Sequence, residues 1–213
     1  MQIAPRRGFL LTVEGIDGSG KTSQARRVAA WLRDAGHDVV ETREPGGSEG
    51  AEAIRALLLG GDGARWSAET ELLLFTAARR DHVERVLRPA LAAGRVVVCD
   101  RYLDSTRAYQ GADPALRGKI DTLHHLMIGL DPDLTLLFDL APEAAAARRA
   151  ARGDADRFET RGLDVDRATR ARFLEIAAAE PDRVVVIDAD RPEGEVTAAA
   201  VACLAPHLPV LAR

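Results

Sequence analysis

The chain is short of several residue types, and each shortage excludes a class of protein. It holds two cysteines, Cys99 and Cys203, with no metal-ligand spacing near either, so a disulfide framework is excluded and a reducing compartment is expected. No run of about 18 apolar residues occurs, so we expect no membrane-spanning segment. The apolar run Phe9–Val13 after Arg6-Arg7 is too short for an export signal, which favours a cytoplasmic protein.

An excess of charge of one sign is also lacking, because the formal net charge is only -4. Such a balance gives no general attraction to nucleic acid or to acidic membranes, so any binding of phosphate must be local. Asparagine is absent, and Lys21 and Lys119 are the only lysines. Lys21 is therefore conspicuous in a chain that otherwise uses arginine for positive charge.

The length of 213 residues and the 46% of hydrophobic residues suit one compact domain spanning residues 1–213. Short apolar runs with little alternation recur between helical patterns, as expected of parallel strands that are buried on both faces. The pattern predicts a doubly wound α/β fold, a five-stranded parallel sheet with helices on both faces. The predicted strands are Phe9–Glu14, Asp38–Thr42, Arg95–Cys99, Leu134–Leu140 and Arg183–Asp188. The predicted helical stretches are Lys21–Ala35, Glu49–Leu59, Ala68–Ala93, Leu103–Gly129 (a region), Pro142–Arg152, Val165–Glu180 and Pro192–Leu204.

A glycine-rich segment between the first strand and the first helix fits the phosphate-binding motif G-x-x-x-x-G-K-[ST]. Its backbone N–H groups can converge on phosphate, helped by the positive end of the helix that follows. Lys21 can reach the β- and γ-phosphates, and Thr22 can bind Mg²⁺. The residues expected to hold ATP are Gly15, Gly18, Ser19, Gly20, Lys21, Thr22 and Ser23.

Such a P-loop also occurs in GTPases, motors and transporter subunits. A GTPase reads guanine with an N-K-x-D element, which a chain without asparagine cannot contain. The size leaves no room for motor or transporter domains. A small kinase of the nucleotide kind is what remains.

Further segments resemble the thymidylate kinase family, in order along nearly the whole chain. They are Arg43–Gly47, Leu74–Arg79, Asp100-Arg101-Tyr102 with Ser105–Gln110, Asp131–Thr135 and the arginine-rich Arg148–Glu159. The resemblance implies a P-loop kinase fold that transfers the γ-phosphoryl group of ATP to dTMP, giving dTDP and ADP for dTTP synthesis. It also implies a homodimer.

Two residues are candidates for the acceptor phosphate and its sugar. Asp17 is an acidic group in a loop built for anions, which makes sense if it accepts a hydrogen bond from a sugar hydroxyl or holds Mg²⁺ near the acceptor. The family resemblance implies the 3′-hydroxyl of dTMP. Arg43 follows a strand, at the end where α/β sheets bind ligands, and resembles the family residue at the acceptor phosphate. Pro45, in the turn after it, is included in the substrate site.

Phe75 and Arg79 lie four residues apart, hence on one helix face. An aromatic face can stack on a base, and a guanidinium can donate to a pyrimidine carbonyl. The resemblance implies that both bind thymine, although Phe75 alone would also suit a core position. It also implies that Tyr109 lies against the deoxyribose, where a 2′-hydroxyl would clash, and that Thr106 and Gln110 lie at the base.

Asp100 ends a predicted strand, where it can serve Mg²⁺ or the acceptor oxygen, and Arg101 can span the two phosphates. The resemblance implies that this pair acts near the transferred group. Some family members carry an arginine within the P-loop, where this chain has Gly18. We therefore expect a lid at about residues 148–161 to supply the positive charge, with Arg152 and Arg157 catalytic and Arg148 at ATP. A basic helix end that complements its own dipole is the alternative interpretation.

Two other functions remain open from the residues. A kinase of another nucleoside or nucleoside monophosphate would differ in the pocket of Phe75 and Arg79. An ATP-binding regulatory or assembly protein would keep the P-loop but need neither acceptor arginines nor a lid.

Overall fold

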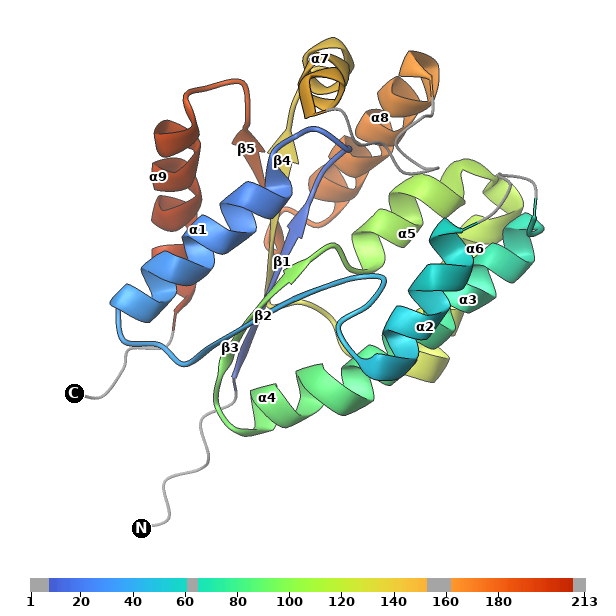
Figure 1. Cartoon of the computed structure of the whole chain (residues 1–213), viewed down its shortest axis with the longest axis horizontal. Helices are drawn as coiled ribbons and strands as arrows, with labels where there is room; N and C mark the ends of the chain where they lie inside the picture. The colour runs from blue at the N-terminus through green and yellow to red at the C-terminus, as the bar shows by residue number, and fades with distance from the viewer. Residues whose placement is uncertain (1–7, 61–64, 153–161, 209–213) are drawn as a thin grey trace.

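The computed structural model describes residues 8–60, 65–152 and 162–208, which form a five-stranded parallel sheet between two layers of helices (Figure 1). The strand order is β2-β3-β1-β4-β5, and every neighbouring pair is parallel. The predicted α/β fold is thereby confirmed. The strands are β1 (Phe9–Glu14), β2 (Val39–Arg43), β3 (Val96–Asp100), β4 (Leu134–Asp139) and β5 (Val184–Asp188).

Burial differs between the middle and the edges of the sheet. The three central strands are buried almost throughout, whereas β2 and β5 each expose two residues. The expectation that all five strands are buried on both faces was therefore wrong for the two edge strands. An edge strand lies at the margin of the helical layers, so its polar residues, such as Glu41 in β2, stay in contact with water.

Helices cover both faces of the sheet (Figure 1). On one face α1 packs beside α9, and on the other α5 packs beside α8. Within the described ranges, no helix combines the length and the apolar character that a membrane span requires. The helices are α1 (Lys21–Asp34), α2 (Glu49–Leu59), α3 (Ala68–His82), η1 (Val83–Leu87), α4 (Arg88–Ala92), α5 (Leu103–Tyr109), η2 (Gln110–Ala112), α6 (Pro114–Leu123), η3 (His124–Ile128), α7 (Pro142–Arg152), α8 (Leu163–Ala179), α9 (Glu193–Leu204) and η4 (Ala205–His207).

Two long helical predictions are subdivided in the structure. The predicted helix Ala68–Ala93 contains a π-helical turn, η1, between α3 and α4. The region Leu103–Gly129 contains a 3₁₀ turn and a further π-helical turn, η3. Most of the predicted lid, residues 153–161, lies outside the described residues.

The carboxyl ends of three neighbouring strands meet at one edge of the sheet. Asp100, which ends β3, pairs with Val13 near the end of β1 and with Arg43 at the end of β2. The segments that follow these strands therefore leave the sheet side by side, where open α/β sheets bind ligands. This register brings the P-loop, the Arg43–Gly47 turn and Arg101 together from distant parts of the sequence.

A buried ion cluster fixes α5, the helix that leaves β3, against the start of β5. Arg183 donates two hydrogen bonds to Asp104 at 2.8 and 3.0 Å and a third to Thr135 Oγ1 at 2.7 Å. The side chain of Asp104 is 3% exposed, so its charge depends on these partners and on Arg107, 3.1 Å away.

Replacement of Arg183 by Ala should destabilise the fold, because Asp104 would keep a buried charge with only Arg107 beside it. We expect the free energy of unfolding in urea to fall by about 3 kcal/mol. The matched control is Arg167→Ala, which removes an exposed arginine paired with Glu143 and should change stability little. Equal effects of the two substitutions would contradict the importance assigned to the Asp104 cluster.

Candidate active site

The P-loop forms an open cradle between β1 and α1. Gly20 precedes α1 in a left-handed conformation, with φ of 89°, and no side chain of the described residues caps the first turn of the helix. The N–H groups of that turn are therefore available to an anion, as the sequence predicts. The hydroxyl of Ser19 is buried and has no hydrogen-bond partner among the described residues, which fits a loop that closes around phosphate oxygens.

Helix α7 packs directly against this loop at Gly18. A Cβ atom on Gly18 would lie 2.4 Å from the carbonyl oxygen of Ala145, and the φ of +91° also disfavours any side chain there. Arg149 of α7 donates a hydrogen bond to the carbonyl oxygen of Asp17 and another, at 2.5 Å, to Asp166 of α8. The close approach explains why this P-loop carries no arginine of its own, and it ties the helix that leads into the predicted lid to the phosphate cradle.

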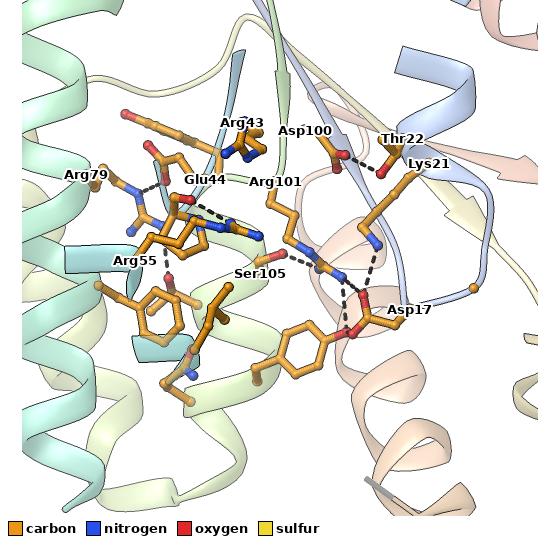
Figure 2. Close-up of a pocket in the computed structure, with 18 of the residues that line it drawn as sticks. Asp17, Lys21, Thr22, Arg43, Glu44, Arg55, Arg79, Asp100, Arg101 and Ser105 are labelled. Carbon is orange, nitrogen blue, oxygen red and sulfur yellow. Dashed lines mark hydrogen bonds and ion pairs between the residues drawn. The ribbon is translucent and has the colours of Figure 1, made fainter. Parts of the chain in front are cut away.

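Asp17 is the centre of a charged cluster between the P-loop and α5 (Figure 2). Its carboxylate accepts from Lys21 at 3.1 Å, from Tyr109 at 3.2 Å, and from Arg101. Burial opposes the charge of Asp17, but Arg101 and Lys21 outweigh it and hold the pKa of the carboxyl far below its usual range. The acid that looked anomalous in an anion-binding loop is thus an ionised partner of two cations.

Arg101 itself is held by several groups. It donates to Ser105 Oγ at 2.8 Å and to the carbonyl oxygen of Gly15 at 3.2 Å. Its backbone φ is 70°, in the left-handed region that non-glycine residues rarely adopt. Such an outlier is kept only where the surroundings enforce it, which is common at functional sites.

Thr22 and Asp100 meet where the sequence places a metal ion. The hydroxyl of Thr22 donates to Asp100 Oδ2 at 2.5 Å, while Oδ1 of Asp100 is buried with no hydrogen-bond partner among the described residues. Oxygen atoms of this kind fit Mg²⁺. The described residues contain no cluster of three or more His, Cys, Asp or Glu that could hold a metal.

A cavity of about 320 Å³ extends from the P-loop to α3, within the size range of small-molecule sites. It brings together fifteen of the predicted site residues: Asp17, Gly18, Gly20, Lys21, Thr22, Ser23, Arg43, Pro45, Phe75, Arg79, Asp100, Arg101, Thr106, Tyr109 and Gln110. Gly15 and Ser19 belong to the P-loop but do not line it. Glu44, Arg55, Leu59, Tyr102 and Ser105 also line the cavity, and sequence reasoning had not assigned them.

At the end of the cavity far from the P-loop, Arg79 is buried against an acid. Its Nε donates to Glu44 at 2.7 Å and its Nη2 donates to Thr106 Oγ1 at 3.0 Å (Figure 2). Phe75, one turn earlier on α3, lines the same cavity and is half-buried. Gln110 donates to Glu71 at 2.9 Å. This end combines an aromatic ring, a cation and amide or hydroxyl groups, which suits a flat polar ring such as a base.

Two arginines lie between these ends. The side chain of Arg43 is 53% exposed and pairs with Glu52 at 2.9 Å. Arg55 of α2 donates to the carbonyl oxygen of Pro45 at 2.7 Å. Arg55 was missed because nothing in the helical pattern of α2 distinguishes it from a surface arginine, and only the packing of α2 against the Arg43–Gly47 turn directs it inward.

The predicted lid arginines are only partly described. Arg148 is exposed near the end of α7, donates to the carbonyl oxygen of Ala189 at 3.1 Å, and would lie 4.0 Å from a Cβ on Gly20. Arg148 is thus beside the P-loop but outside the cavity. Arg152 ends α7, and its side chain is not described; Arg157 lies outside the described residues.

Glu14 is a further residue that sequence reasoning missed, because it reads as the polar end of a strand. It is fully buried and accepts from the backbone N–H groups of Tyr102 and Ser105, at 2.7 and 3.1 Å, and from Ser105 Oγ at 2.6 Å. Burial, together with the charge of Asp104, raises its pKa from 4.5 to about 7 against the opposing effect of Arg101. Glu14 thereby anchors the start of α5, beside Arg101.

Comparisons with known proteins agree on one family. The family model described as thymidylate kinase matches residues 13–200. The thymidylate kinase of Dinoroseobacter shibae is 59% identical over 96% of this chain and 98% of its own. The thymidylate kinase of Ruegeria pomeroyi is 57% identical over 94% of this chain and 96% of its own. The solved structure of thymidylate kinase from Ehrlichia chaffeensis superposes with a TM-score of 0.75 at 33% identity, covering 93% of this chain and 99% of that one.

The buried carboxyl of Glu14 predicts a pH effect on stability. Between pH 4.5 and about 7, the unfolded chain has released this proton while the folded chain still holds it. The folded state then binds more protons, so stability should fall as pH rises through that window, by roughly 3 kcal/mol in total. In Glu14→Gln this fall should be absent, as measured by urea unfolding across the window. Glu175→Gln, at an exposed position, is the control. Parallel curves for wild type and Glu14→Gln would refute the shifted pKa.

Proposed function

The chain belongs to the thymidylate kinase family and transfers the γ-phosphoryl group of ATP to dTMP, giving dTDP and ADP; we propose that the two substrates meet at Asp17, Lys21 and Arg101. One observation carries this proposal. These charged groups lie between a phosphate cradle on one side and a base-sized pocket on the other, within a single cavity.

For the donor, we propose that the P-loop residues Gly15, Gly18, Ser19, Gly20, Lys21, Thr22 and Ser23 hold the phosphates of ATP, with Arg148 at the nucleotide. Two observations on the described residues support this assignment: none of their side chains caps the first turn of α1, and none of them bonds the hydroxyl of Ser19. Thr22 and Asp100 would hold Mg²⁺. When bound, the ion supplies countercharge to the phosphates.

For the acceptor, we propose that Arg43 and Arg101 bind the phosphate of dTMP and that Asp17 accepts a hydrogen bond from its 3′-hydroxyl. Pro45 shapes this part of the pocket, and Arg55 is a further candidate for the phosphate. Tyr109, within hydrogen-bonding distance of Asp17, would lie against the deoxyribose. Phe75 stacks on thymine, Arg79 donates to it, and Thr106 and Gln110 complete the base end.

Catalysis then follows from the placement of positive charge. Phosphoryl transfer gathers negative charge on the moving group and needs an in-line arrangement rather than a covalent intermediate on the protein. Lys21 and Arg101 both pair with Asp17, so their ammonium and guanidinium groups lie close together in the cavity. We propose that both stabilise the negative charge of the transferred phosphoryl group. We propose that Arg152 and Arg157 add charge from a lid at about residues 148–161.

We also propose that residues 1–213 form a single domain, which the continuous sheet supports, and that the protein acts in the cytoplasm. The proposed assembly is a homodimer. Helix α3 and the turn η3 lie against each other. They carry three apolar side chains that are exposed in the single chain and that a dimer contact would cover. These are Leu73, Leu126 and Met127, exposed by 56%, 69% and 48%.

Lys21→Ala should abolish most turnover while the protein still folds, because Arg101 remains beside Asp17. The ammonium group contacts only Asp17 among the described side chains. Its loss removes positive charge that stabilises the transition state, so we expect kcat to fall about 10³-fold. Release of ADP with Mg·ATP and dTMP measures this, and circular dichroism checks the fold. Lys119→Ala, at an exposed lysine paired with Glu69, is the matched control. An undiminished kcat in Lys21→Ala would overturn the P-loop assignment.

A further inference from the structure

Arg79 is restrained on three sides at the base end of the cavity. Glu44 accepts from its Nε at 2.7 Å, and Thr106 accepts from its Nη2 at 3.0 Å. The third restraint is aromatic, because its Cζ lies 5.0 Å from the centroid of the Tyr102 ring. Glu44 is held in turn by His82, 3.0 Å away.

These restraints leave one donor nitrogen for a ligand. No described residue accepts a hydrogen bond from Nη1 of Arg79, and Arg79 lines the cavity. The two hydrogen bonds fix the guanidinium within its plane, at Glu44 and Thr106. The two hydrogen bonds leave the guanidinium free to rotate about the line that joins Glu44 and Thr106. The ring of Tyr102, which lies against the guanidinium, blocks that rotation. The direction of Nη1 therefore depends on the ring.

Tyr102 is itself immobilised, as a positioning residue must be. It is 1% exposed, and its hydroxyl donates to the carbonyl oxygen of Leu130 at 2.9 Å. The edge of the ring meets His124, with centroids 6.2 Å apart. Its backbone N–H donates to Glu14 at 2.7 Å. The ring is therefore held by β1, η3 and the segment after η3, and none of these three contacts comes from α3, the helix that carries Arg79.

We propose that Tyr102 is a positioning residue for base recognition: its ring holds the guanidinium of Arg79 so that Nη1 faces a carbonyl oxygen of the pyrimidine. This inference rests on the proposed function, in which Arg79 donates to thymine. A fixed N–H donor favours a base with a carbonyl oxygen at that point, as in dTMP and dUMP. It opposes dCMP, if its amino group falls there, because two donors would then face each other.

The test compares substitutions that keep or remove the aromatic face. Tyr102→Phe keeps the ring, whereas Tyr102→Leu removes it, and Tyr102→Met fills the space with a flexible side chain and serves if Leu does not fold. KM for dTMP should rise about tenfold in Tyr102→Leu and Tyr102→Met, since a desolvated cation–π contact is lost, and stay within about twofold in Tyr102→Phe. KM for ATP and kcat should change by less than about twofold in all three variants.

A double-mutant cycle separates positioning from a general packing defect. If Tyr102 acts through Arg79, then adding Tyr102→Leu to Arg79→Gln should raise KM for dTMP by less than about twofold over Arg79→Gln alone. The control for loss of a buried aromatic side chain is Phe138→Leu, in the core on β4. It should lower the temperature of unfolding without changing KM for dTMP.

The outcomes distinguish this inference from the proposed function. A wild-type protein that does not turn over dTMP would refute the proposed function itself. If the wild type is active, three results would overturn the role of Tyr102. These are an unchanged KM for dTMP in Tyr102→Leu or Tyr102→Met, equal rises in KM for ATP and dTMP, or a full additional rise in the Arg79→Gln background.

Discussion

The site depends on one half-buried carboxylate, Asp17, and on the two cations that neutralise it. Lys21 belongs to α1 and Arg101 follows β3, so a single acid joins the P-loop to the carboxyl end of the neighbouring strand. Partial burial disfavours the charge of Asp17, and these two cations keep the carboxyl ionised by holding its pKa far below the usual range. The same pairing holds both cations at the point where we propose that the two phosphates meet, and an enzyme that transfers a phosphoryl group needs positive charge there.

Two further parts of the structure support this cluster. Helix α7 packs so closely on Gly18 that this position of the loop has no space for a side chain. Arg149 of the same helix binds the carbonyl oxygen of Asp17. Glu14, at the end of β1, anchors α5 through Ser105, and Ser105 in turn binds Arg101. These contacts link the phosphate cradle to the base end of the cavity, so that distances between the two are set by the packing of the sheet and helices rather than by loops.

Much of this could be predicted from the sequence, for identifiable reasons. The P-loop is local, so its chemistry can be recognised in eight consecutive residues, and β1 was predicted at its observed bounds because its apolar run ends in a glycine-rich turn. Glu44 could not be assigned, since its partners Arg79 and His82 lie 35 and 38 positions away. Tyr102 was known only as part of a motif, because its contact with Arg79 joins α3 to the segment after β3, which the sequence does not place together.

The most direct test of the central role of Asp17 compares dTMP with its 3′-deoxy analogue, using kcat/KM for wild type and Asp17→Ala. If Asp17 accepts a hydrogen bond from the sugar hydroxyl, removal of that hydroxyl should lower kcat/KM of the wild type by about 10- to 100-fold, as for a hydrogen bond to a charged group. In Asp17→Ala, whose activity we expect to be low, removal of the hydroxyl should have little further effect. An equal loss in both proteins, or no loss in the wild type, would contradict the account.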